Sequence, residues 1–166
     1  NKCIWEKVVV CNLELKRPKK AIEALNRIIN IEPTSHSVWA DKAYLHLLLN
    51  ETNEGISALH ESLKLNPRNK RDWQLYAMAL MADEEWEEAT WALENSLQLN
   101  PNSAIDWYNY AACKFILGEY QLALDASQQA IVLDPSMELL TDEWTDQAQD
   151  EMGDTQDFLE RLSPAS

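Results

Sequence analysis

The side chains that could support metal or nucleophilic chemistry are few, and their spacing does not suit it. Three histidines lie on separate helical positions, without the cysteine or aspartate spacing that is typical of a zinc site. The chain has no recognisable nucleophile motif, phosphate loop or pair of carboxylates, and its three glycines leave little for a phosphate loop. We therefore expect no catalytic residue, no metal and no cofactor, and we interpret His36, His46 and His60 as surface or half-buried polar residues.

The cysteines point to a reducing compartment. Cys3, Cys11 and Cys113 form no CxxC pair, and an odd number of them gives no disulfide framework. We interpret all three as small packing residues. No apolar run approaches the roughly 18 residues that a transmembrane helix needs, and no secretory signal is visible. The expected location is cytoplasmic.

The charge of the chain excludes some partners. Its net charge is −14, which argues against binding to nucleic acid or to anionic membranes, since both depend on clustered Lys and Arg. The charge is also uneven. Residues 2–35 carry seven basic and four acidic side chains, whereas residues 138–166 carry one basic and nine acidic side chains.

A repeat of 34 residues sets the positions of the helices. Tryptophan recurs at this spacing, and so does proline; the positions are Trp5, Trp39, Trp73 and Trp107, and Pro33, Pro67, Pro101 and Pro135. Apolar residues at helical spacing predict two helices in each repeat. The expected ranges include 2–15 and 18–31 in the first repeat and 36–49 and 53–65 in the second. Proline ends each repeat because it cannot continue the helical hydrogen bonds.

The turns and the end of the chain complete this prediction. We expect an acidic turn over 83–85 and a left-handed residue at Gly118. After Pro135 a capping helix is expected, broken at Gly153 and followed by a short helix. The predicted apolar stripe of the first piece is Leu140, Trp144, Ala148 and Met152, and the short helix carries Phe158, Leu159 and Leu162. Residues 163–166 are expected to be a frayed tail.

These residues resemble the tetratricopeptide repeat (TPR) family over residues 2–135. The matching positions are the four tryptophans, the small residues Ala43, Ala77 and Ala111 in the first helices, and Ala21, Gly55, Ala89 and Ala123 in the second. Val9 and Ile28 replace small residues in the first repeat, where we expect looser packing, and Lys42 takes a position that is usually aliphatic.

The resemblance implies an all-α fold, a right-handed superhelical solenoid of antiparallel helix pairs. The expected repeats are 2–35, 36–69, 70–103 and 104–137, followed by capping helices over 138–162 and the tail over 163–166. Ile4 and Val8 suggest that an upstream repeat is missing, so additional repeats before residue 1 are also expected.

The resemblance also implies a non-catalytic protein-interaction module. In this family the first helices of successive repeats line a concave groove that holds a peptide or a partner helix. By register, we predict that an apolar or amphipathic segment binds to Tyr44, Leu48, Leu75, Met78, Tyr108, Asn109 and Phe115. The alternative is that the chain's own C-terminal helices or neighbouring repeats cover these residues.

Two further hypotheses concern other partners. Some members of the family bind the terminal carboxylate of chaperones through a clamp of Lys, Arg and Asn. Glu6, Val10 and Leu75 stand at three of the clamp positions and only Asn109 fits, so we do not expect this activity. The second hypothesis is a self-associating scaffold, in which the basic first repeat of one copy meets the acidic cap of another.

Overall fold

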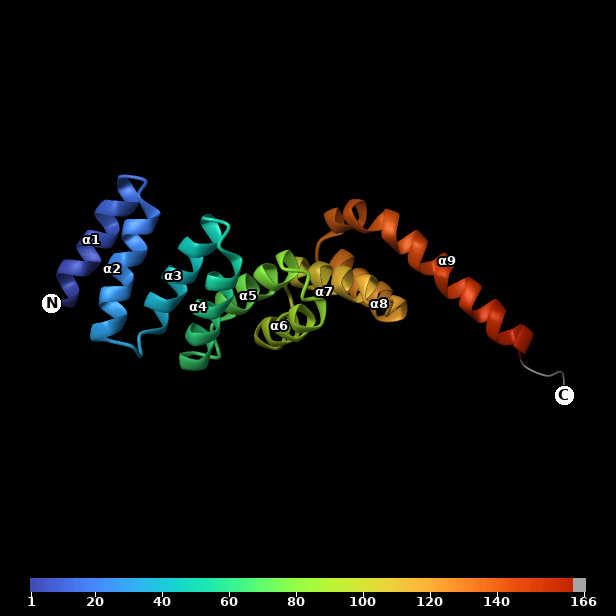
Figure 1. The fold of residues 1–166 in the computed structure, drawn as a ribbon. Helices are drawn as coiled ribbons and strands as arrows, with labels where there is room; N and C mark the ends of the chain where they lie inside the picture. The colour runs from blue at the N-terminus through green and yellow to red at the C-terminus, as the bar shows by residue number, and fades with distance from the viewer. Residues whose placement is uncertain (163–166) are drawn as a thin grey trace. The chain divides into compact units, whose positions relative to one another are not determined.

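The computed structural model of the chain describes the backbone of residues 1–162 and the side chains of residues 1–142 and 144–153. The predicted tail and the side chains of Phe158, Leu159 and Leu162 lie outside this description. The described residues form helices and no strands (Figure 1). The helices are α1 (Lys2–Glu14), α2 (Pro18–Ile31), α3 (His36–Leu48), α4 (Thr52–Leu65), α5 (Lys70–Ala82), α6 (Trp86–Leu99), α7 (Ala104–Ile116), α8 (Tyr120–Leu133), the short 3-10 helix η1 (Pro135–Met137) and α9 (Glu138–Leu162).

The helix boundaries lie where the sequence predicts them. Pro18 is the first residue of α2, where its missing N–H has no role in the helix. In each of the first three repeats the second helix ends two residues before the repeated proline, since a residue before proline avoids helical backbone angles. The prediction of an all-α architecture of helix pairs is confirmed.

One left-handed residue turns the chain inside each repeat. Positive φ angles occur at Lys16 (54°), Asn50 (57°), Glu84 (61°) and Gly118 (77°), which are spaced by the repeat length. This conformation reverses the chain within three residues, so α1 and α2, α3 and α4, and α7 and α8 run antiparallel, as Figure 1 shows for α1 and α2. The prediction of a left-handed residue at Gly118 is confirmed, and three residues with side chains adopt the same conformation.

The recurring tryptophans and prolines are joined by hydrogen bonds. The indole nitrogen of Trp39 donates to the carbonyl oxygen of Pro33 over 2.9 Å. Trp73 and Trp107 repeat this bond to Pro67 and Pro101, each over 2.8 Å. Each indole therefore fixes the turn that brings the chain from one repeat into the next, which explains why the two residue types share one period.

The chain divides into two compact units, residues 1–84 and 85–166. This boundary lies between α5 and α6, the two helices of the third predicted repeat. The ends of the four predicted repeats stay a prediction. In the first unit, the buried core of the first three helices includes Val9, Ile28, Val38 and Leu45. Val9 and Ile28, which replace small residues of the other repeats, are therefore both part of this core.

Polar side chains join successive helices where the first repeat uses apolar ones. In the first unit the Ser62 hydroxyl of α4 donates to Asp72 Oδ2 of α5 over 2.6 Å, with both residues buried. In the second unit Ser96 of α6 and Asp106 of α7 repeat this contact at 2.8 Å. The corresponding residues 34 positions before Ser62 and Asp72 are Ile28 and Val38, which pack in the core.

The C-terminal cap differs from the prediction. A single helix, α9, runs through Gly153, so the predicted break there is wrong. An isolated glycine costs a helix only about 1 kcal/mol relative to alanine, and the neighbouring Glu, Gln and Asp positions continue the turn. Of the predicted apolar stripe, Ala148 is buried and Trp144 and Met152 are half-buried, but Leu140 is exposed and the neighbouring Thr141 is buried instead.

Within the described residues, no helix has both the length and the apolarity required to cross a membrane.

Candidate functional site

A small hollow lies between α3 and α5 in the first unit, at the positions that the resemblance assigns to a groove. Its volume is about 170 Å³. It is lined by His36, Ser37, Ala40, Asp41 and Tyr44 from α3, and by Asn69, Arg71, Asp72 and Leu75 at the start of α5. These two helices contact each other directly. Residues 37, 40, 41 and 44 recur every three or four positions, so they share one face of α3.

Three of the predicted binding residues present apolar surface on α3 and α5: Tyr44 lines the hollow, Leu48 lies one helical turn after Tyr44, and Met78 lies one turn after Leu75. Tyr44 is 43% exposed, Leu48 59% and Met78 57%. Leu75 lines the hollow and is half-buried against the small cluster of Ala43, Ala58 and Leu59. Because soluble proteins leave few large apolar side chains this open in one place, the four residues together form a candidate contact surface.

Polar side chains also line the hollow, among them His36, Asp41 and Asp72. Partial removal of solvent raises the pKa of the Asp41 carboxyl above its ordinary value; the positive charge of Arg71 opposes this shift and the carboxylate of Asp72 adds to it. Nδ1 of His36 is buried and has no hydrogen-bond partner among the described residues. The hollow thus combines exposed polar side chains, such as Asp41, with the apolar side chains of Tyr44 and Leu75.

The predicted residues of the second unit are less open. Tyr108 and Asn109 of α7 are half-buried. Phe115 packs between two other rings, with centroid distances of 5.6 Å to Tyr120 and 5.5 Å to Trp144 of α9. The chain's own C-terminal helix therefore packs against Phe115. At this residue the structure agrees with the alternative that the C-terminal helices cover the predicted binding residues.

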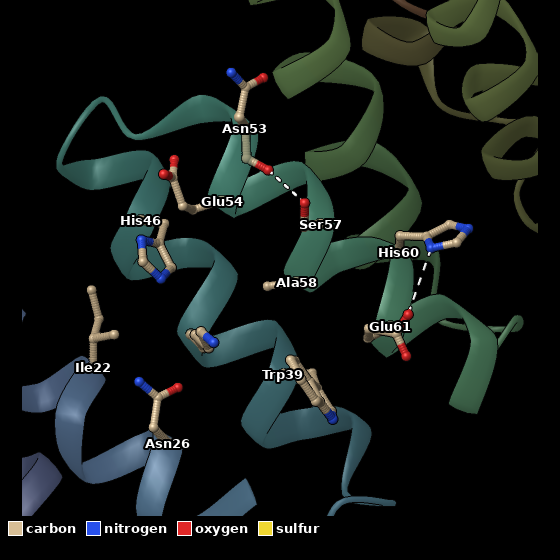
Figure 2. A pocket seen from close by; sticks show the side chains of 11 residues that line it. Ile22, Asn26, Trp39, His46, Asn53, Glu54, Ser57, Ala58, His60 and Glu61 are labelled. Carbon is tan, nitrogen blue, oxygen red and sulfur yellow. Dashed lines mark hydrogen bonds and ion pairs between the residues drawn. The ribbon is translucent and has the colours of Figure 1, made fainter.

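A larger hollow, of about 630 Å³, lies on the opposite face of α3 and escaped the sequence prediction (Figure 2). Residues of α2, α3 and α4 line it, among them Asn26, Trp39, His46, Glu54 and His60. Lys42 also lines it, with Nζ 5.2 Å from the centre of the Trp39 ring. Burial lowers the pKa of Lys42. The only sequence signal for this hollow is Lys42, at a position that is usually aliphatic in the family.

Two interpretations of single residues are wrong. His46 is buried, and its Nδ1 lies 2.7 Å from Glu51 Oε2, so it fastens the turn between α3 and α4. Cys3 and Cys11 are exposed, and only Cys113 is a buried packing residue. Burial raises the pKa of the Cys113 thiol to about 11, with Lys114 acting in the opposite direction.

Within the part that the structure describes, no group of three or more His, Cys, Asp or Glu side chains could hold a metal ion.

The comparisons with known proteins concern the fold. Residues 60–130 match the protein family described as anaphase-promoting complex, cyclosome, subunit 3, a family of TPR type. No curated protein sequence gives a significant match. Among solved structures, a crystal structure of MamA superposes with a TM-score of 0.77 at 17% identity, covering 92% of this chain and 88% of that one.

A second structure supports the same conclusion. MamA from Desulfovibrio magneticus RS-1, from residue 41 to its end, gives a TM-score of 0.75 at 17% identity, covering 99% of this chain and 97% of that one. At this level of identity the likeness establishes the fold class, an all-α solenoid of helix pairs, and nothing about ligands.

Proposed function

Because the chain is built from tetratricopeptide-type repeats, we propose that it is a non-catalytic interaction module that binds an apolar or amphipathic segment of another protein. The segment lies against α3 and α5, on Tyr44, Leu48, Leu75 and Met78. The protein acts as an adaptor or scaffold through this contact. The observation that supports the proposal is the hollow between these helices, whose lining includes Tyr44 and Leu75, two of the residues that the register assigns to the groove.

The side chains indicate the chemistry of the ligand. Apolar residues of a bound helix or strand would cover Leu48 and Met78, which removes apolar surface from water and supplies the main favourable free energy. The thioether of Met78 adapts to different ligand shapes. A polar side chain of the ligand would enter the hollow, where it can hydrogen-bond to the exposed carboxylate of Asp41.

The second unit contributes less to this proposal. Phe115 is packed against Trp144 and offers little free area, so we place the centre of binding on α3 and α5 rather than on α7. Tyr108 and Asn109 of α7 stay predicted binding residues of the second unit by itself.

A capture experiment with two matched variants tests the proposal. The bait is the chain itself, compared with Leu48→Glu, Met78→Glu, which adds two charges to the proposed surface. The control is Ser57→Glu, His60→Glu, which adds two charges to exposed positions of α4 (Figure 2). All four positions are exposed, so circular dichroism should show unchanged helicity for both variants.

We expect a protein that the unmodified chain and the control retain, and that the Leu48→Glu, Met78→Glu variant loses. A protein lost only with the control would place binding on the opposite face of α3 and α4 and would contradict the proposal.

The self-associating scaffold remains the second candidate, although the basic end is partly neutralised. Lys2 Nζ lies 2.6 Å from Glu32 Oε2 and 3.7 Å from Glu6 Oε1, and Lys19 lies 3.9 Å from Glu51. These pairs reduce the positive charge available to an acidic cap. Sedimentation at low ionic strength distinguishes the candidates, since stacking driven by charge would be strongest there.

A further inference from the structure

A hollow of the second unit is lined by two aromatic rings and a carboxylate. Its volume is about 340 Å³, and it lies between α6 and α7, which pack against each other. The lining residues are Glu94, Leu97 and Gln98 of α6 and Trp107 and Tyr110 of α7. This volume is at the small end of the range of about 300–1,000 Å³ in which proteins bind small ligands. The hollow therefore has room for a chemical group of side-chain size, and the proposed contact on α3 and α5 does not involve it.

The two rings stand at an angle to each other. Trp107 and Tyr110 are three positions apart, so they share one face of α7. Their ring centroids are 6.1 Å apart and their planes meet at 86°. Both side chains are half-buried, and the buried side chain of Leu97 completes the apolar part of the lining. Because the faces of such rings carry partial negative charge, they attract a cation that enters the hollow.

The carboxylate of Glu94 adds a full negative charge to the hollow. Its Oε1 accepts a hydrogen bond from the Tyr110 hydroxyl over 3.2 Å, which holds the exposed carboxylate beside the ring. Burial raises the pKa of Tyr110 to about 12, and the negative charge of Glu94 adds to the shift, so the hydroxyl stays a donor at neutral pH. Residues 85–166 carry 17 acidic and two basic side chains, so the wider field also favours a cation.

The chain places its own ammonium groups on the same ring positions. Lys42 stands 68 positions before Tyr110, and its Nζ lies 5.2 Å from the centre of the Trp39 ring, the equivalent of Trp107. Lys114 Nζ lies 5.6 Å from the centre of the Tyr110 ring, outside the lining of the hollow. Both distances are within the roughly 6 Å of cation–π attraction. In the hollow itself Tyr110 replaces the lysine, which leaves the space beside Trp107 to a cation from outside.

The preceding aromatic pair has different neighbours. Trp73 and Tyr76, 34 positions earlier, also meet edge to face, with centroids 6.2 Å apart. His60 takes the position of Glu94 there, and Lys64 lies one turn further along α4. A lysine at that place disfavours a second cation, whereas a glutamate favours one. The combination of two rings with an acidic neighbour therefore belongs to the hollow of the second unit.

We propose that this hollow binds an alkylated ammonium group, such as the trimethylammonium group of choline or of a methylated lysine. The methyl groups contact the two rings and Leu97, and the positive charge lies beside the carboxylate of Glu94. An unmodified lysine fits less well, because its three N–H groups need acceptors and Glu94 already accepts from Tyr110. The proposal concerns the second unit by itself and does not depend on the contact on α3 and α5.

An NMR titration with choline chloride tests the proposal, with the indole N–H signal of Trp107 as the reporter. The Trp107→Phe variant identifies this signal, because its spectrum lacks it. The matched ligand is the carbon isostere of choline, in which a neutral tert-butyl group replaces the trimethylammonium group. We expect choline to shift the signal to saturation in the millimolar range, and the isostere to bind at least about tenfold more weakly. An isostere that binds as tightly as choline would overturn the proposal, since the hollow would then select shape without charge.

Two exposed glutamates of α6 supply matched variants. Glu94→Gln removes the charge beside the hollow and should weaken choline binding at least about fivefold. Glu88→Gln removes an equal charge six positions away, on a different side of the helix, and should leave the affinity unchanged. Equal affinity losses in the two variants would indicate general attraction to an acidic chain and would contradict a defined site, as would an unchanged affinity in Glu94→Gln.

Two peptides of one sequence, with either a trimethylated or an unmodified lysine, distinguish the sources of the group. Choline binding without peptide binding would assign the site to a small molecule. Binding of the trimethylated peptide as well, seen at the same Trp107 signal, would assign it to a modified protein segment, and both results support the proposal. An unmodified peptide that binds as tightly as the trimethylated one, or a Trp107 signal that choline does not move, would refute it.

Discussion

A hydrogen bond accounts for the strict spacing of tryptophan and proline. The indoles of Trp39, Trp73 and Trp107 each donate to the carbonyl oxygen of the proline six residues earlier, so in these three pairs the tryptophan needs the proline at that spacing. The sequence revealed the period but not this bond, because a spacing of six residues across a turn fits neither a helix nor a strand pattern. The Ser62–Asp72 contact escaped prediction for the same reason: no local pattern pairs a buried serine with a buried aspartate.

Trp73 is the best of the tryptophans for testing the packing. It is the most buried of the three hydrogen-bonded indoles and lies edge-on to Tyr76, with ring centroids 6.2 Å apart. Replacing it in Trp73→Ala should lower the free energy of unfolding by about 3–5 kcal/mol, because the substitution leaves a cavity and an unpaired Pro67 carbonyl. Urea denaturation measures this loss. The Trp73→Phe variant, which keeps a ring, should lose markedly less, and a loss below about 1 kcal/mol for Trp73→Ala would contradict the account.

The Ser62–Asp72 contact predicts strong coupling between two helices. Removing the hydroxyl in Ser62→Ala should cost about 1–3 kcal/mol, because the Asp72 carboxylate stays buried without this bond. Asp72→Ala should cost less, because the Ser62 hydroxyl keeps the carbonyl oxygen of His36, 2.8 Å away, as an acceptor. The double variant should cost less than the sum of the two, by about 0.5–3 kcal/mol. A double-mutant cycle of urea denaturation measures the coupling. Additive losses would mean that the hydroxyl and the carboxylate do not interact.

Cys113 predicts a pH dependence of stability. Burial raises the pKa of its thiol to about 11 from the ordinary 9.0, so the folded chain retains a proton that the unfolded chain releases. Stability from this group is complete below pH 9 and is lost as the pH rises through 11, by about 3 kcal/mol in total. Urea denaturation between pH 8 and 11 should give a flatter profile for Cys113→Ala. Tyr110, whose pKa burial raises to about 12, contributes equally to both proteins. Parallel profiles would contradict this prediction.

At the scale of the helices, the turn inside each repeat imposes a conformational requirement that only one repeat meets with glycine. Lys16, Asn50 and Glu84 adopt the left-handed conformation at a cost in backbone strain, whereas Gly118 adopts it freely. The sequence revealed the fourth of these turns through its glycine. It did not reveal that the other three share the conformation, since lysine and glutamate give no such signal.

Two glycine substitutions should therefore have opposite signs. Gly118→Ala has open space around its new methyl group but needs a positive φ, so it should cost about 1 kcal/mol of unfolding free energy. Gly153→Ala, also in open space but inside α9, should stabilise the helix by up to about 1 kcal/mol. Thermal unfolding followed by circular dichroism measures both. A destabilising Gly153→Ala would indicate that the helix does break at Gly153, as the sequence alone suggested.

The misplaced break in α9 shows the limit of local signals. Glycine lowers helix propensity, but a single one does not stop a long helix whose neighbours favour it. The burial of Thr141 in place of Leu140 could not be predicted, because packing against α8 decides which side of α9 is buried, and Thr141 gives no apolar signal.

At the scale of the whole molecule, the fold could be predicted and the site only in part. The 34-residue period gave the helix pairs because each repeat buries the same positions. Register then placed Tyr44 and Leu75 beside one hollow, as it should where α3 and α5 are neighbours in one unit. Register could not predict that Trp144 would cover Phe115, because α9 lies outside the repeat pattern.

Photo-crosslinking at two matched positions tests the central claim, that a partner binds against α3 and α5. A photoreactive phenylalanine analogue replaces either Tyr44, on the proposed surface, or His60, on the opposite face of the first unit; both side chains are exposed. Each variant is irradiated in lysate of the source cell. The account predicts a discrete partner crosslinked from position 44 and absent from position 60. A partner crosslinked from position 60 and not from position 44 would contradict it.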